Sequence, residues 1–360
     1  MTFVQDFIAL FRHTTNSYKY LFLKSVINRA KNGEFVLSID DVVLDILVYA
    51  WYPNQYFKLS FGVQDKVGNL FRNQDFNFND IGAITSTGFT TSLRDALSKE
   101  VNKVELKKEL ARYVQYRLLS PFFAEELRGQ PDGKKNRMIK ESAAARYDSR
   151  KPLYRISECS KKIETHPEWG RFIQDNYPLL LQYLESRWVA FLQKQNPEVP
   201  AIIHKTAPPA SRSSLSRQRA YWGEFLKKNC KSSCIYAGTP LPLDNFSLDH
   251  FLPWSFVCHD RVWNLVPTTV GINSSKGNSL PNLELYLENF IDFQLAAMRY
   301  HSKNNHKWEL IAAEIASDLK ISPQLITIKE SVVSDKLCSY ISTQHQVAEQ
   351  LGFTTWALCN

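Results

Sequence analysis

Five polar residues between positions 249 and 276 have the types and the spacing that hydrolysis of a phosphodiester bond requires. Asp249 and His250 are adjacent at the end of an apolar run, and Asn264, Asn273 and Lys276 follow in order. Such a reaction needs a base for the attacking water, a divalent cation at the scissile phosphate and a rigid frame for both. This stretch of sequence contains a candidate for each of these roles.

The candidate ligands of the cation are Asp249 and Asn273. The first offers a hard anionic oxygen and the second a neutral oxygen, a pair that favours Mg²⁺ or Mn²⁺ over zinc. Water and the substrate phosphate would complete an octahedron, and so small a number of protein ligands is typical of magnesium. We therefore expect Mg²⁺ or Mn²⁺ as the cofactor.

The other three residues have candidate roles around the cation. His250 is the candidate general base, because an imidazole can take a proton from water at neutral pH. Asn264 is expected to hold His250 in place, since its amide has both donors and an acceptor with which to tie the intervening loop. Lys276 lies three residues beyond Asn273 on one face of a predicted helix, so its ammonium is a candidate contact for a phosphate oxygen.

The frame for these residues is predicted to be a hairpin followed by a short helix. Residues 234–238 and 246–251 are short apolar runs joined by a turn rich in Pro, Asp and Asn, which predicts a β-hairpin. Residues 268–276 predict a short helix that ends at Gly277.

Three ordered blocks of this sequence resemble the HNH, or ββα-metal, endonucleases. They read Leu-Asp249-His250-Phe-Leu-Pro-Trp-Ser, then Trp-Asn264-Leu-Val-Pro, then Asn273-Ser-Ser-Lys276-Gly-Asn278-Ser-Leu-Pro, and the resemblance covers residues 230–281. The closest resemblance is to the zinc-free type of RNA-guided DNA endonucleases and of bacterial defence and restriction nucleases. It implies a single-metal, DNA-cutting site in which Asp249 and Asn273 bind the ion, His250 activates water and Asn264 supports the histidine.

The sequence departs from those relatives that hold a structural zinc with two Cys-x-x-Cys pairs. Cys234 is followed three positions later by Ala237, and no cysteine pair follows Asn273. An alternative set, formed by Cys230, Cys234, Cys258 and His259, matches a zinc site in residue type but not in spacing. We therefore expect no structural zinc.

Positive charge is concentrated in the middle of the chain. Lysine plus arginine exceed aspartate plus glutamate by nine over residues 121–231 and by three over residues 1–120, with a deficit of four over residues 232–360. Such a surplus is typical of a face that binds a polyanion, and the alternative is a solvated basic surface. The candidate nucleic-acid-binding residues are Lys134, Lys135, Arg137, Lys140, Arg212, Arg217, Arg219, Lys227 and Lys228.

Apolar periodicity predicts a mainly α fold with a small α+β module. Helices are expected over residues 3–11, 18–28, 42–51, 92–119 and 172–195, and three more over 283–300, 308–319 and from 322 onward. Residues 69–88 predict a loop or short hairpin, and residues 130–162 an exposed strand-and-loop element. We expect a helical N-terminal region with the basic segment over 1–206, a linker over 207–219, the HNH nuclease domain over 220–300, and C-terminal helices packed on it over 301–360.

Composition excludes several other classes of protein. The 360 residues, 44% of them apolar, can build ordinary cores in about two domains, so disorder and disulfide scaffolds are excluded. The six scattered cysteines indicate free thiols. The best apolar run, residues 42–51, is short and contains Asp45, and the first residues lack a secretory pattern, so we expect a cytoplasmic protein without a membrane partner.

Two functions remain open from the sequence. The first is a metal-dependent DNA endonuclease of bacterial defence or restriction, with RNA as the alternative substrate and an activating or defence-system protein as a compatible partner. The second is a nucleic-acid-binding or partner-recruiting protein in which the HNH module is a non-catalytic scaffold. The intact set Asp249, His250, Asn264 and Asn273 favours the first, since a decayed module is expected to have lost a member. The sequence leaves the oligomeric state open.

Overall fold

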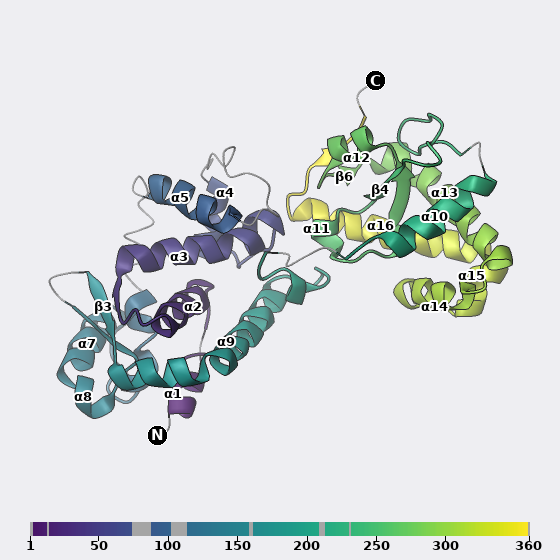
Figure 1. Ribbon diagram of the computed structural model, residues 1–360. Helices are drawn as coiled ribbons and strands as arrows, with labels where there is room; N and C mark the ends of the chain where they lie inside the picture. Colours follow the sequence, from purple (N-terminus) through teal and green to yellow (C-terminus); the bar gives the residue numbers. More distant parts are fainter. Residues whose placement is uncertain are drawn as a thin grey trace. The chain divides into compact units, whose positions relative to one another are not determined.

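The computed structural model describes residues 3–12, 14–73, 88–101, 114–157, 161–208, 213–229 and 232–358. The chain divides into two compact units: unit 1 comprises Met1–Pro197 and Ile202–Ala210, and unit 2 comprises Glu198–Ala201 and Ser211–Asn360. Helices dominate both units and the few strands are short, which confirms the predicted fold class (Figure 1). Within the described residues, no helix combines the length and the apolar character needed to cross a membrane.

Three helices form the centre of unit 1. The helix α2 (Tyr18–Lys31) packs against both α3 (Ile39–Trp51) and α9 (Pro167–Gln195). Aromatic rings fill the contact between α2 and α9, where the ring centroid of Trp188 lies 5.5 Å from that of Tyr20. Ser38 caps α3, because its hydroxyl accepts a hydrogen bond from the backbone amide of Asp40 at 3.2 Å.

Further helical elements of unit 1 differ in their boundaries from those expected from the sequence. They include α1 (Phe3–Ala9), η1 (Tyr52–Tyr56), α4 (Lys66–Asn73), α5 (Phe89–Val101), η2 (Ser120–Phe123) and η3 (Ile202–His204). The helix α4 extends into the segment predicted as a loop over 69–88, because Val67 and Phe71, one turn apart, are both buried. Residues 74–87 of that loop and residues 102–113 of the helix predicted over 92–119 lie outside the described residues.

A small antiparallel sheet completes unit 1. Its strands β1 (Val36–Ser38), β2 (Tyr154–Ile156) and β3 (Lys162–Thr165) lie in the order β1-β3-β2. Ile163 of the central strand pairs with Leu37 on one side and Ile156 on the other, and these three side chains are buried. The sheet therefore turns one apolar row toward the core.

The prediction of an exposed strand-and-loop element over residues 130–162 was wrong. Most of this segment forms α7 (Asp132–Ala145) and α8 (Tyr147–Arg150), followed by β2. Ile139 and Ala143, one turn apart on α7, are both 0% exposed, so two positions are enough to dock a helix whose other faces are polar. The low apolar content that suggested a loop reflects this narrow contact.

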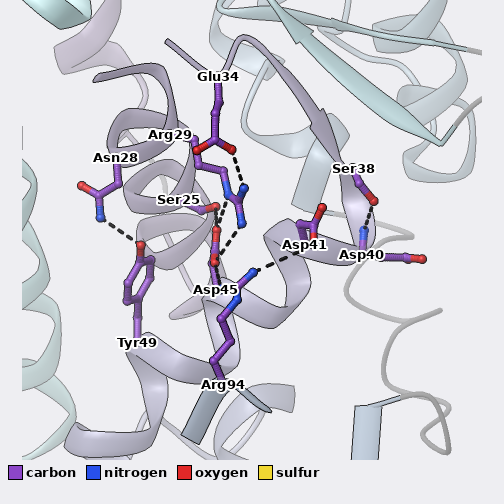
Figure 2. A network of polar contacts seen from close by, with 10 residues as sticks. All are labelled: Ser25, Asn28, Arg29, Glu34, Ser38, Asp40, Asp41, Asp45, Tyr49 and Arg94. Carbon is purple, nitrogen blue, oxygen red and sulfur yellow. Dashed lines mark hydrogen bonds and ion pairs between the residues drawn. The ribbon is translucent and has the colours of Figure 1, made fainter. Parts of the chain in front are cut away.

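A buried carboxylate joins α2, α3 and α5. Asp45, in the apolar face of α3, is 5% exposed and accepts hydrogen bonds from Ser25 Oγ at 2.6 Å and from Arg29 Nε at 2.6 Å. Arg94 of α5 also forms an ion pair with it, and Figure 2 shows that these donors converge on one side chain. The charge that interrupts an otherwise apolar helix is thus compensated by two guanidinium groups.

Replacing Asp45 with asparagine is expected to destabilise unit 1. The variant Asp45→Asn should lower the free energy of unfolding by about 3 kcal/mol, because it leaves two partly buried guanidinium groups without their carboxylate. Urea unfolding followed by circular dichroism measures the loss. Asp41→Asn on the same helix is the matched control, since that side chain is 54% exposed and lies 3.9 Å from Arg94. Equal losses in the two variants would contradict the assignment.

Unit 2 is built around a two-stranded sheet, and helices precede and follow its strands in the sequence. Its elements are α10 (Ser216–Lys228), β4 (Ser247–His250), α11 (Trp254–Val257), η4 (Val262–Asn264), β5 (Leu265–Thr268), α12 (Val270–Lys276), β6 (Leu280–Pro281), α13 (Leu283–Asn304), α14 (Trp308–Leu319), α15 (Pro323–Ile328), α16 (Glu330–Gln350) and β7 (Thr355–Trp356). The rings of Phe251, after β4, and Phe290 of α13 stack at 3.9 Å. The helix α13 therefore supports the end of β4.

The predicted hairpin was wrong in its partners. The strand β4 pairs antiparallel with β5, whereas the earlier apolar run forms a turn held by a single bridge between Ser233 and Pro240. Pro240 and Pro242 follow this run and donate no backbone hydrogen bond, which disfavours a longer ladder here. Two other boundaries shift: α10 begins at Ser216, inside the predicted linker, and the third C-terminal helix is divided into α15 and α16.

Candidate active site

The five candidate residues are carried by β4, η4 and α12. Asp249 pairs with Val266 and His250 with Leu265 in the ladder between β4 and β5. Thr269 caps α12, its hydroxyl accepting from the amide of Ile272 at 3.3 Å, and the helix ends at Gly277, whose φ of +53° suits glycine. This confirms the predicted short helix. The elements of the site come in the order strand β4, strand β5, helix α12 along the chain.

Asp249 is buried, with 2% of its surface exposed, and two side chains donate to its carboxylate. The hydroxyl of Tyr236 donates to Oδ2 at 2.6 Å, and Lys276 Nζ lies 3.2 Å from Oδ1 and 3.1 Å from Oδ2. Burial lowers the pKa of Lys276, and the Asp249 carboxylate opposes that shift. Burial also raises the pKa of the Tyr236 hydroxyl well above its ordinary value, so this group keeps its proton and remains a donor.

Two side chains one turn apart on α12 contact β4. Asn273 Nδ2 donates to Ser247 Oγ at 2.7 Å, and Lys276 Nζ donates to the backbone oxygen of His250 at 2.7 Å. Ser247 and Asp249 lie on one face of the strand, because side chains alternate along it. The structure therefore brings the two residues assigned to the cation, Asp249 and Asn273, to facing positions of strand and helix.

The donors Asp249 and Asn273 suit a hard divalent cation in type. Among the described residues, no group of three or more His, Cys, Asp or Glu side chains could hold a metal, so such an ion would depend on this pair with water and substrate. Lys276, which the sequence assigned to a substrate phosphate, is 1% exposed and contacts Asp249 instead. A cation at Asp249 would therefore share the carboxylate with this ammonium or replace it.

His250 points to the opposite face of β4 from Asp249, as alternation along a strand requires. Its Nε2 lies 2.8 Å from Oδ1 of Asp260, and 11% of its side chain is exposed. Asp260 belongs to the segment between α11 and η4, and Gln218 Nε2 of α10 donates to its backbone oxygen at 2.8 Å. A carboxylate accepts hydrogen bonds, so this contact fits the tautomer of a neutral imidazole that has its proton on Nε2 and its lone pair on Nδ1.

Asn264 holds the chain just after His250. Its Oδ1 accepts from the amide of Leu252 and its Nδ2 donates to the oxygen of the same residue, both at 2.9 Å. The Asn264 side chain is 0% exposed, and its own backbone oxygen accepts from the amide of Phe251 at 2.8 Å. It thus acts on the backbone beside the histidine rather than on the imidazole.

Two residues of this site were missed from the sequence. Asp260 had a usable signal, because it is the only acidic residue between His250 and Asn264. Tyr236 had none, since nothing in the pattern of residues 234–238 relates its hydroxyl to Asp249.

The cysteines and His259 of the alternative zinc set have other partners where the structure describes them. Cys234 Sγ lies 3.1 Å from Thr268 Oγ1, and Cys258 Sγ lies 3.9 Å from the backbone oxygen of Ser255. Burial, with smaller contributions from Arg261 and His250, lowers the pKa of His259 to about 4. Cys230 lies outside the described residues.

The candidate nucleic-acid-binding residues fall on one helix in each unit. Lys134, Lys135, Arg137 and Lys140 lie on α7 of unit 1, Arg217, Arg219, Lys227 and Lys228 lie on α10 of unit 2, and Arg212 lies outside the described residues. Arg219 donates to the backbone oxygen of Phe246 at 2.6 Å and its guanidinium lies 5.2 Å from the centre of that ring. It anchors the segment before β4, so its contribution is structural in addition to its charge.

Several of these basic residues are paired with carboxylates. Arg137 lies 2.7 Å from Glu141, and Lys135 lies 4.0 Å from Asp132. Arg217 lies 3.4 Å from Glu314. Such exposed pairs are weak, so the charges remain open to exchange for a phosphate.

Residues 234–282 match the HNH endonuclease family. The matched segment contains all five candidate residues together with Tyr236 and Asp260, so this part of unit 2 is an HNH domain, and the resemblance seen in the sequence is confirmed. The rest of the chain lies outside the match. No curated protein and no solved structure matches the chain.

Loss of the Asn264 side chain is expected to destabilise unit 2 and to impair the site. Asn264→Ala leaves the amide and the oxygen of Leu252 without partners in a buried position, so the free energy of unfolding should fall by about 2 to 4 kcal/mol. Thermal and urea unfolding measure the change. Asn278→Ala, at an exposed position of the same domain, is the control and should remain close to wild type. If Asn264→Ala were as stable as wild type, the two hydrogen bonds between the Asn264 side chain and the backbone of Leu252 would contribute little to stability.

Proposed function

We propose that the protein is a metal-dependent endonuclease that hydrolyses phosphodiester bonds of DNA, with the HNH domain of unit 2 as its catalytic part. HNH domains are in general nucleases, and the candidate residues lie within residues 234–282, the segment that matches this family. The observation that carries the proposal is the bond between His250 and Asp260 beside the buried Asp249. A histidine oriented by a carboxylate is the arrangement that a general base requires.

His250 would take the proton of the attacking water at Nδ1. Asp260 would hold the proton of the neutral imidazole on Nε2, and it would stabilise the imidazolium once the second proton arrives. Asn264 fixes the backbone at Leu252, two residues beyond the base, so the imidazole is mounted on a rigid segment. These contacts supply orientation and charge stabilisation without help from the substrate.

A divalent cation would be held by Asp249 and Asn273. When bound, it would stabilise charge on the scissile phosphate and on the leaving oxygen. Asp249 is rigid in this role, because Tyr236 and Lys276 fix both of its oxygens. Mg²⁺ or Mn²⁺ agrees with two oxygen donors and remaining water ligands.

A polyanionic substrate agrees with the distribution of charge. Residues 121–231 carry the excess of positive charge, and α10, which bears four of the candidate basic residues, leads directly into the HNH domain. Phosphate contacts of this kind position a nucleic acid without selecting its sequence. Defence against foreign DNA in the cytoplasm, with an activating protein partner, is the biological setting that the resemblance suggests.

A second function, a binding or recruiting scaffold without turnover, has one observation in its favour. The ammonium of Lys276 already compensates the charge of Asp249 in a fully buried ion pair. If this pair does not open, the carboxylate cannot serve a cation, and the HNH domain would be a folded module only.

Removal of the imidazole separates the two functions. Purified protein incubated with supercoiled plasmid, single-stranded DNA and RNA should nick or linearise DNA with Mg²⁺ or Mn²⁺ and not with EDTA. In His250→Ala the rate should fall by about 10²- to 10⁴-fold, as expected for loss of a general base, while DNA binding is retained. The control is His306→Ala, which alters an exposed histidine and should cleave like wild type. Identical behaviour of wild type and His250→Ala in every assay would support the scaffold.

Asp260 is expected to act through His250 as a positioning residue. Asp260→Asn keeps the size of the side chain but removes its charge, so cleavage should slow by about 10- to 100-fold with little change in substrate KM. Asp244→Asn, in the exposed segment before β4, is the matched control. A loss of folding in Asp260→Asn, or a rate equal to wild type, would contradict this role.

A further inference from the structure

A cleft of about 1500 Å³ lies in unit 1, apart from every residue assigned to catalysis. Its walls come from α1, the start of α2, residues 114–128, α7, α8 and the start of α9. Pockets for small molecules usually measure about 300 to 1000 Å³, so there is room for a ligand of that class with surrounding water.

Charged side chains line this cleft, and several of them lack a counterion. Within the described part of the chain, Arg12 and Arg128 form no ion pair, and Lys19 donates only to the backbone oxygen of Arg12 at 3.4 Å. The other cations of the lining are paired, as Arg117 is with Asp132 at 2.8 Å. The unpaired cations are therefore a feature of one part of the lining.

One of these cations is partly withdrawn from water. Burial lowers the pKa of Lys19 to about 8. A desolvated charge without a partner is unfavourable, and such groups in a cleft are typical of ligand sites, where the ligand supplies the missing partner.

Aromatic rings line the same cleft. Phe3, Tyr18 and Phe122 are half-buried, so each leaves part of its surface accessible. The Phe3 ring stacks on Phe172 at 5.5 Å and the Phe122 ring packs on Trp169 at 6.0 Å, which fixes their orientation. Fixed rings beside unpaired cations can hold a molecule that has both a flat ring and phosphate groups.

We propose that this cleft binds a nucleoside polyphosphate. Arg12, Lys19 and Arg128 would meet the phosphate groups, and the aromatic rings would contact the base. Asp6 and Glu125, which also line the cleft, would accept hydrogen bonds from hydroxyl or amino groups.

Calorimetric titration of the full chain tests this proposal with ATP, ADP, adenosine, inorganic pyrophosphate and a short single-stranded DNA as separate probes. ATP or ADP should bind. Adenosine should bind more weakly because it lacks the phosphate groups, and pyrophosphate should bind more weakly because it lacks the base. Lys19→Met and Arg128→Gln should each weaken nucleotide binding by about tenfold or more, as expected for loss of a charge-assisted hydrogen bond. Lys194→Met, at an exposed position of α9 outside the cleft, should bind like wild type.

Three outcomes would overturn the proposal. They are the absence of nucleotide binding to wild type, nucleotide binding that neither cleft variant weakens, and binding of the DNA strand in this cleft in preference to nucleotides. Arg128 is exposed, so its variant is expected to fold and keeps the test valid should Lys19→Met be unstable. Because the readout is binding and not cleavage, the result is independent of the proposed nuclease activity.

Discussion

A buried ion pair between Asp249 and Lys276 joins the strand and the helix of the HNH domain. Removing both charges from water is costly, and the pair is tolerated because the hydroxyl of Tyr236 and the backbone oxygen of His250 satisfy the remaining hydrogen bonds. The register of α12 against β4 depends on this pair, and with it the position of Asn273. Because the ammonium of Lys276 already compensates the charge of Asp249, a cation could bind there only by sharing the carboxylate with this ammonium or by replacing it.

The strand itself separates the two parts of the chemistry. Asp249 and His250 are neighbours in the sequence, yet they face opposite sides of β4, one toward α12 and the other toward Asp260. Each side has its own support, because Lys276 and Tyr236 fix the carboxylate while Asp260 fixes the imidazole. A short strand thus mounts a cation ligand and a base independently of each other.

Buried charge has two different settings in unit 1. Asp45 is surrounded by donors from α2 and α5, so its charge is compensated and it binds helices together. Lys19 is also withdrawn from water, but it has no oppositely charged partner among the described residues. The first arrangement is typical of a structural contact, and the second leaves interactions that a ligand can complete.

The sequence by itself determined the class of fold, most helices and the identity of the HNH segment. Helical spacing and caps such as Ser38 and Thr269 are local signals, and the motif blocks have fixed order and spacing. It did not determine which strand pairs with β4, nor the helix α7, whose contact rests on two buried residues. Tertiary structure alone decided that Asp260 meets His250 and that Lys276 meets Asp249 rather than solvent, because such pairs depend on which segments fold against each other, and spacing along the chain does not encode that distance.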